Sequence, residues 1–353
     1  MSDSTIQAEL PKTNRPGSQP LRRAIAVHRG SRAWAATTQL IVTTFLFVFS
    51  WWCMWRSREL GFWAPLLLSV PTAGFLVRLF ILQHDCGHGS MFASPKLNRL
   101  VGVLLSALTF TPYQCWRRQH AEHHATNGQL DHRGIGDVTT WTVAEYYAAT
   151  PWQRLKYRLY RNPLILFGVG PVIYFAVLQR IPWLLPTTWP KERQSVMWTN
   201  VLLLVVYSAA AWWIGPWTFL TLHLPVVVLA SSVGSWLFFV QHQFPDTYWQ
   251  HDGTWDFARA AIEGSSFLDL PAPLRWITAN IGYHHIHHLD SRIPNYSLVE
   301  CHHAHQELHA ARRLTLKDGL RYGKLKLWDE STHELITFAE SRRRMAQRTA
   351  KSG

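Results

Sequence analysis

Long apolar blocks alternate with polar stretches along this chain. A membrane-spanning α-helix needs about 20 mostly apolar residues. Four blocks have about that length, namely residues 33–55, 62–82, 196–214 and 218–241. A Gly-Pro pair, Gly215-Pro216, separates the last two and predicts a tight turn. The pattern therefore predicts four transmembrane helices.

Two further apolar blocks are poorer candidates for crossing. Residues 99–113 are too short and contain a Thr-Pro pair near their end, whereas residues 163–181 are long enough but carry glycines and a proline. We expect both to be re-entrant or interfacial, because six crossings would separate the histidine-rich stretches between two compartments. With four spans, these stretches and the polar region after about residue 245 share the cytoplasmic side. The expected fold is thus an all-α integral membrane protein with a cytoplasmic histidine-rich cap.

Composition supports this segregation. Apolar residues make up 48% of the chain and charged residues 16%, so a mean hydropathy of −0.07 requires polar and apolar residues to lie in separate blocks. Many of the 19 tryptophans flank apolar runs, as amphipathic rings do at headgroup level. The net charge of +13 comes largely from basic residues beside those runs. This placement fits contact with anionic lipid on the cytoplasmic side and argues against nucleic acid.

The two ends of the chain are predicted to lie outside the membrane domain. Residues 1–31 are polar, basic and proline-containing and lack the apolar core of a signal peptide, so we expect a disordered cytoplasmic tail. Residues 32–310 would form the membrane domain and residues 311–353 a basic cytoplasmic region. The four cysteines show no CxxC and no framework spacing, which predicts neither a zinc site nor disulfides. They are Cys53, Cys86, Cys115 and Cys301.

Candidate chemistry lies in three histidine clusters. His84 and His88 are four residues apart and would share a helix face. The second cluster is an H-x-x-H-H array beginning at His120, and the third contains the same spacing beginning at His284. This repetition leaves His285 as the odd member, expected to support a ligand or to be solvated. The resulting candidate metal ligands are His84, His88, His120, His123, His124, His284, His287 and His288.

Eight imidazoles exceed what one metal ion uses, so two metals fit better. Nitrogen-rich ligation suits several metals, and spacing alone does not choose among them. His242, directly after the last apolar block, is a ninth candidate. A further group, His302, His303, His305 and His309, repeats neither array and suggests one polar helix face. The candidates for orienting the ligands by hydrogen bonds are Asp85, Glu122, Asn280 and Asp290.

The three clusters read HDCGH, HAEHH and HHIHH, with two spans before the first and two between the second and third. In this arrangement the chain resembles the membrane fatty acid desaturases, which carry three histidine boxes. The flanking stretches QHDCGHGS, WRRQHAEHHAT, RGIGD and NIGYHHIHHLDSRIPNY look like the bacterial acyl-lipid branch, omega-6 or delta-12. The resemblance covers about residues 40 to 310.

The resemblance implies an O2-dependent acyl-lipid desaturase that introduces a cis double bond, with delta-12/omega-6 favoured over delta-9. It implies two non-haem irons held by the eight box histidines together with His242. The implied electron donor is a separate protein, either ferredoxin or cytochrome b5 with its NAD(P)H reductase. Arg117, Arg118 and the C-terminal basic residues could dock an acidic donor. The implied location is the bacterial cytoplasmic membrane, with the active site facing the cytoplasm.

Two alternatives remain open on the sequence alone. A hydroxylase or ketolase acting on a lipid, alkane or carotenoid would share the metal site and differ in outcome. A metal transporter would place histidines within spans along a permeation path, whereas nearly all of them here lie at span ends.

Overall fold

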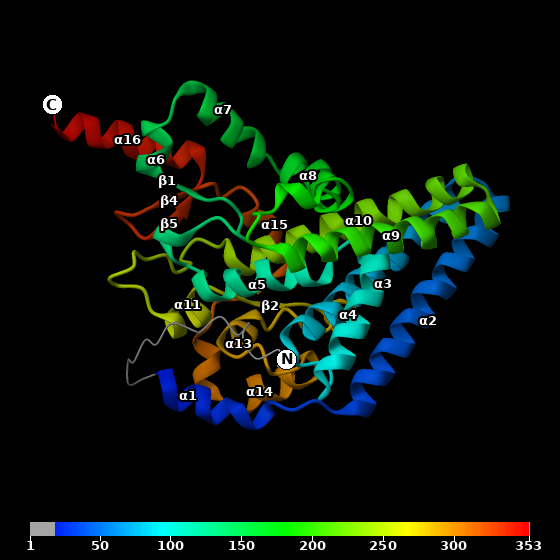
Figure 1. Ribbon diagram of the computed structural model, residues 1–353. Helices are drawn as coiled ribbons and strands as arrows, with labels where there is room; N and C mark the ends of the chain where they lie inside the picture. The colour runs from blue at the N-terminus through cyan, green and yellow to red at the C-terminus, as the bar shows by residue number, and fades with distance from the viewer. Residues whose placement is uncertain (1–17, 353) are drawn as a thin grey trace.

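The computed structural model describes residues 18–352. Four of its helices are long and apolar enough to cross a membrane, which confirms the four predicted spans. Figure 1 shows these four long helices on one side of the molecule and most of the shorter elements on the other. They are α2 (Ala33–Ser57, continued by η2, Arg58–Leu60), α3 (Trp63–His88), α9 (Pro190–Ile214) and α10 (Pro216–His242).

The four spans differ in how much of their surface the protein itself covers. In the most apolar window of α3 and α10 about half of the residues are buried (50% and 44%), against 22% for α2 and 11% for α9. Along residues 197–213 of α9 the large exposed side chains are apolar, Leu204 and Val205 among them. Water would penalise such a surface, whereas lipid does not. Hence α3 and α10 form the centre of the bundle, and α2 and α9 face lipid.

The turn between α9 and α10 carries the interfacial tryptophans predicted from the sequence. Trp212, Trp213 and Trp217 are among the most exposed large side chains of the described chain. Gly215 stands between the two helices with φ 88°, a conformation that favours glycine. The opposite ends of α3 and α10 are His88 and His242, so the two central spans finish in candidate ligands.

The two poorer apolar blocks do not form straight spans. Helix α4 (Pro95–Thr109) has 15 residues and packs against α3, where the Gln83 side-chain amide donates to the carbonyl of Gly102 at 2.9 Å and to that of Thr111 at 3.2 Å. The second block contains a π-helical turn, η4 (Ile165–Val169), followed by α8 (Gly170–Ala176) and η5 (Leu178–Arg180). Together with α7 (Pro151–Tyr160) it forms a pair bent by 58°. The short α4 fits the predicted interfacial piece, and the bend in the second block is that of a broken span or of the predicted re-entrant piece.

The remaining elements form a polar cap, defined here as residues 113–160 and 243–352. It contains two small sheets, one with strand order β1-β4-β5 and one in which β2 and β3 pair in parallel. Its strands are β1 (Trp141–Thr142), β2 (Phe267–Asp269), β3 (Arg313–Thr315), β4 (Leu327–Asp329) and β5 (Glu334–Ile336). Besides α7, its helices are α5 (Tyr113–Thr126), η3 (Leu130–His132), α6 (Val143–Ala148), α11 (Phe257–Glu263), α12 (Ala272–Ile277), α13 (His284–Leu289), η7 (Asn295–Ser297), α14 (Leu298–Ala304), η8 (Gln306–Ala310), α15 (Leu316–Tyr322) and α16 (Phe338–Ser352). A further short turn, η6 (Pro182–Leu184), precedes α9.

The N-terminal expectation needs correction. Residues 18–28 form α1 (Ser18–Ile25) and η1 (Ala26–His28), and Ile25 is fully buried in an apolar cluster of the cap. Ion pairing between Arg29 and Asp290 holds the segment in place, so residues 18–31 are not a disordered tail. The polar composition of residues 1–31 suggested disorder, but apolar residues spaced along one face of α1 allow this helix to pack on the cap. Residues 1–17 of that prediction lie outside the described residues.

The C-terminal boundary at residue 310 stays a prediction. Residues beyond it are integrated with the cap, because β3 pairs with β2 and β4 pairs with β1. Tyr157 from α7 donates its hydroxyl to the Lys326 carbonyl at 2.5 Å, which joins the same two parts of the chain.

Arg78 in α3 is a buried charge in a membrane helix. Its guanidinium donates to the Thr43 hydroxyl at 3.1 Å, to the Gln39 side-chain carbonyl at 3.0 Å and to the Trp276 backbone carbonyl. It therefore joins α2, α3 and the cap element α12. We expect Arg78→Met to destabilise the protein by about 1–3 kcal/mol, since it leaves these acceptors without a donor. Thermal unfolding in detergent measures this, and Arg99→Met on the exposed face of α4 is the matched control. Equal unfolding temperatures for the two variants would contradict the prediction.

Candidate metal centre

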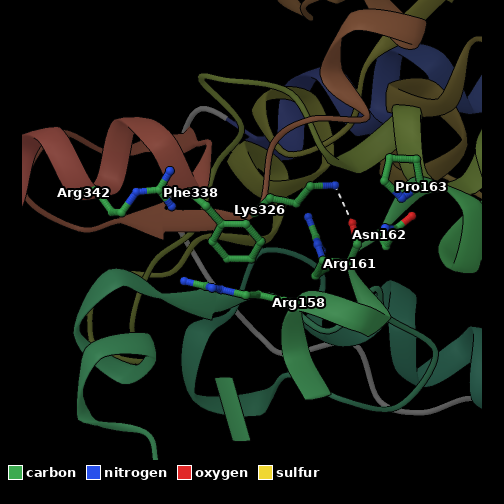
Figure 2. A pocket seen from close by; sticks show the side chains of 7 residues that line it. All are labelled: Arg158, Arg161, Asn162, Pro163, Lys326, Phe338 and Arg342. Atoms are coloured by element: carbon green, nitrogen blue, oxygen red, sulfur yellow. Dashed lines mark hydrogen bonds between the residues drawn. The ribbon is translucent and has the colours of Figure 1, made fainter. Parts of the chain in front are cut away.

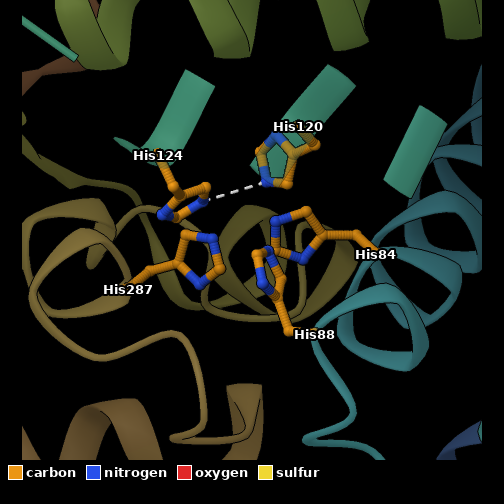
Figure 3. A group of neighbouring side chains, drawn as sticks. All are labelled: His84, His88, His120, His124 and His287. Carbon is orange, nitrogen blue, oxygen red and sulfur yellow. Dashed lines mark hydrogen bonds between the residues drawn. The ribbon is translucent and has the colours of Figure 1, made fainter. Parts of the chain in front are cut away.

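Nine histidines from four helices converge into two buried groups at the end of the bundle. Within each group, one ring nitrogen of every member lies within 4.8 Å of the others. The first group, drawn in Figure 3, is His84, His88, His120, His124 and His287. The second group is His123, His242, His284 and His288. All nine residues predicted as ligands are thus brought together.

Helix geometry explains how one H-x-x-H-H array serves two groups. Residues four apart share a helix face, and neighbouring residues point about 100° apart. On α5, His120 and His124 face the first group with their Nε2 atoms 3.1 Å apart, whereas His123 faces the second. On α13 the assignment is reversed: the Nε2 atoms of His284 and His288 lie 3.1 Å apart in the second group, and His287 belongs to the first. Each of the two H-x-x-H-H arrays therefore contributes histidines to both groups.

The other three members come from the ends of the central spans. His84 and His88 lie in the last turns of α3, with ring centroids 4.7 Å apart, rather than after the span as the sequence suggested. The helix continues to His88 because a polar stretch can remain helical once its side chains find partners. His242, the last residue of α10, places its Nε2 3.2 Å from that of His123 and 3.0 Å from that of His284.

The donor set fits metal ions. Burial lowers the pKa of His120, His124, His284, His287 and His288 well below the usual range, so these imidazoles are neutral, the form that binds metals. Within residues 18–352, the Nε2 atoms of His84, His88 and His287 are buried and make no hydrogen bond. Buried polar atoms without a partner are costly. All three belong to the first group, where a bound cation would satisfy them.

Three acceptors orient the rings from behind. Asp85 contacts His84 Nδ1 at 3.1 Å and in turn accepts bonds from the backbone and side-chain amides of Asn295 at 2.9 and 2.8 Å. Asp137 lies 2.5 Å from His123 Nδ1, and the Gly264 carbonyl lies 3.0 Å from His242 Nδ1. Such partners fix the tautomer and direct Nε2 toward the metal.

Asp137 and Asn295 were missed as orienting residues. Asp137 lies 14 residues from His123, a separation without a helical signal, although it ends the RGIGD stretch. The glycine before it gave the available hint. Gly136 has φ 76°, and an added Cβ would meet the Gln119 carbonyl at 2.8 Å, so only glycine lets the loop approach α5 this closely.

The other three proposed orienting residues have different partners. Glu122 pairs with Arg118, and Asp290 pairs with Arg29 and Arg292. Asn280 donates its side-chain amide to the Asn295 carbonyl at 3.0 Å. It therefore supports the residue that holds Asp85 and does not itself bond a box histidine.

His285 lies outside both groups and is fully buried, so the expectation of a solvated ring is wrong. Its ring lies 5.4 Å, centroid to centroid, from that of His302 on α14. Burial lowers its pKa to about 3, and it is neutral. The α13 helix turns it away from the metal groups and toward the cap interior.

Two cavities lie near the broken span and the second group. The smaller, about 10 Å³, has room for about one water and is bordered by His123, Asp137, His242 and Trp249. The larger, about 300 Å³, is strongly basic (Figure 2). Its lining residues are Arg158, Arg161, Asn162, Pro163, Lys326, Phe338 and Arg342. Arg342 is one of the C-terminal basic residues considered for donor docking, whereas Arg118 already pairs with Glu122 and Glu192.

Gly87 lies against Trp116, whose ring packs on His120 of the first group. A Cβ at this position would lie 2.7 Å from Trp116, whose indole stacks on His120 with centroids 4.6 Å apart and planes 19° apart. We expect Gly87→Ala to reduce activity by displacing Trp116, and to cost about 1–3 kcal/mol of stability through overpacking. Gly234→Ala on α10 is the control, because nothing lies within 4 Å of its added Cβ. Product formation per inserted protein is the measurement, and unchanged activity in Gly87→Ala would contradict it.

Comparison with known proteins agrees with this geometry. The profile of the family described as fatty acid desaturase matches residues 60–318. A fatty acid desaturase from Bacillus subtilis is 40% identical over 300 residues, which are 85% of each chain. An sn-2 acyl-lipid omega-3 desaturase (ferredoxin) from Arabidopsis thaliana is 30% identical over 71% of this chain and 54% of its own. An sn-1 oleoyl-lipid 12-desaturase from Synechocystis is 24% identical over 78% of this chain and 76% of its own. The chain belongs to the fatty acid desaturase family and is an integral membrane oxidoreductase.

Proposed function

We propose that this protein is an acyl-lipid desaturase whose nine clustered histidines hold two non-haem irons. The observation that carries the proposal is the division of these residues into groups of five and four, each compact enough for one ion. Within these two groups every member is a histidine, and imidazole nitrogen suits iron. When bound, the irons supply the oxidising power by which dioxygen removes two hydrogens from adjacent methylenes.

The residues of this chain supply position and protection. The centre lies where α3 and α10 end, so an acyl tail in the bilayer would approach it along these two spans. Eight of the nine histidines are buried, and the remaining one, His88, is partly buried. Exclusion of water protects a strongly oxidising site from side reactions. Each double bond formed consumes one dioxygen, two hydrogens from the acyl chain, and two electrons and two protons from outside the protein. Two waters are released.

We further propose a delta-12/omega-6 position for the double bond and a ferredoxin-type donor. The 12-desaturase relative and the flanks of the histidine boxes support the position. The ferredoxin-dependent relative supports the donor. An acidic donor would complement the basic cavity shown in Figure 2. We place the protein in a bacterial cytoplasmic membrane with the cap in the cytoplasm, because the basic residues of α1 and α7 flank that end of the bundle.

The test is expression in a bacterial host that makes no polyunsaturated fatty acid, with a delta-9 monoene supplied. We expect a new cis diene, and mass spectrometry of double-bond adducts would place the second bond at carbon 12. A new bond at any other position overturns the regiochemistry while supporting desaturation. A hydroxylated or keto product overturns desaturation and favours the hydroxylase alternative. Membranes assayed with reduced ferredoxin or with reduced cytochrome b5 then distinguish the donors.

A further inference from the structure

We propose that His28, Cys301 and His305 form a third metal site, separate from the two histidine groups, which binds a single zinc-class cation. Cysteine spacing along the sequence gave no sign of such a site. In the structure, one ligand atom from each of these residues lies within 4.8 Å of the others. The three come from η1, from α14 and from the residue after α14, so the site would join the N-terminal segment to the cap.

The geometry of the two imidazoles resembles that inside the main centre. The Nε2 atoms of His28 and His305 lie 3.3 Å apart, and the rings meet edge to face at 89° with centroids 5.3 Å apart. Nε2 pairs within the two histidine groups lie 3.0–3.2 Å apart. Two neutral rings can share one proton, but a cation between them satisfies both lone pairs together.

Cys301 supplies the feature that the main centre lacks. Its side chain is fully buried beside Ile25, Leu298 and Leu308, where a small apolar residue would also fit. As a free thiol it would stay protonated, because burial raises the pKa of Cys301 to about 12. A bound cation stabilises the thiolate and reverses that preference. The sulfur lies beside the pair His28 and His305, which connects the N-terminal segment to the end of α14. Apolar packing of Cys301 alone does not explain this position.

One thiolate and two imidazoles suit Zn²⁺, which takes tetrahedral nitrogen and sulfur ligands. His28 and His305 are partly exposed, so a water can complete the fourth position. The cation would strengthen a contact that already exists, because Arg29 pairs with Asp290 and the Arg32 amide donates to the Tyr296 hydroxyl at 2.8 Å. Asp290 lies two residues after His288. Metal binding here would therefore fix the N-terminal segment against the third histidine box.

Cobalt substitution tests the site in the full-length protein purified in detergent. A cysteine thiolate bound to Co²⁺ gives an intense near-ultraviolet charge-transfer band, and none of the nine clustered histidines can produce it. We expect this band with one cobalt equivalent per chain, its loss in Cys301→Ser and in His305→Gln, and its retention in Cys115→Ser and His303→Ala. His303 is an exposed neighbour on the same helix. Absence of the band, or its persistence in Cys301→Ser, overturns the proposal.

Metal content gives a second measurement that does not depend on desaturation. After growth with zinc, His28→Gln and His305→Gln should each lose one zinc per chain and keep their iron. Both positions are partly exposed and need no repacking, which guards against misfolding of Cys301→Ser. Unchanged zinc in these two variants overturns the site. Iron without lipid turnover in the parent protein would count against the proposed function and leave the zinc result standing.

Discussion

Replacing His123 with alanine is expected to abolish desaturation while leaving the protein inserted in the membrane. His123 is one of four ligands in the second group, and its Nε2 lies 3.2 Å from that of His242. Removing it leaves three imidazoles for the ion of the second group, which has four ligands against five in the first. It also leaves the buried Asp137 carboxylate without its partner. An unpaired buried charge is strongly destabilising to the local arrangement. The measurements are product formation by gas chromatography and iron per chain by mass spectrometry.

His285→Ala is the matched comparison within the third box. His285 is a histidine on the same helix as three proposed ligands, yet it belongs to neither group. We expect it to keep both irons and measurable activity. Since the ring is fully buried, its removal should cost about 1–3 kcal/mol of stability through the cavity left behind. Equal loss of iron in His123→Ala and His285→Ala would contradict the H-x-x-H-H register on which the two groups rest.

Helical periodicity and membrane length account for what the sequence predicted well. The four spans follow from apolar length alone, and the expectation that all nine histidines converge followed from requiring the three clusters to share one side of the membrane. The boundaries were less accurate. The second span was expected to end near residue 82, but α3 continues to His88 because polar residues of the first box are held by Asn295 and neighbouring rings. Such support comes from distant parts of the chain and has no local signal.

The same reason explains why the orienting residues were only partly predicted. Asp85 is adjacent to His84 and was found, whereas Asp137 reaches His123 through a loop whose path depends on two positive-φ glycines, Gly134 and Gly136. Asp290 looked equally suitable next to the third box, yet an arginine of the N-terminal segment takes it. That pairing could not be foreseen while residues 18–31 were expected to be disordered. The position of the N-terminal segment thus explains why Asp290 pairs with Arg29 and not with a box histidine. The same position brings His28 to Cys301 and His305 in the proposed third metal site.

Asp137→Ala is expected to lower iron affinity and activity by about 10- to 100-fold, the usual effect of removing a group that orients a metal-bound histidine. Its Oδ1 lies 2.5 Å from His123 Nδ1, and the contact holds Nε2 toward His242. Asp137→Asn should retain more activity than alanine, because the amide oxygen can still accept the Nδ1 proton although the charge is lost. Iron per chain and product formation, both measured as a function of iron in the growth medium, report the effect.

Excess iron separates a positioning role for Asp137 from a purely structural one. If the carboxylate acts by orienting His123, added iron should partly restore the metal content of Asp137→Ala. Iron per chain should be highest with Asp137, lower in Asp137→Asn and lowest in Asp137→Ala. Asp131→Asn is the control, because Asp131 is an exposed carboxylate that pairs with His251 at 2.8 Å and touches no member of either group. A fall in Asp131→Asn as large as that in Asp137→Ala would show that the effect arises from the loop as a whole. Loss of membrane-inserted protein without change in iron per chain would likewise contradict the positioning role, since the carboxylate would then serve folding alone.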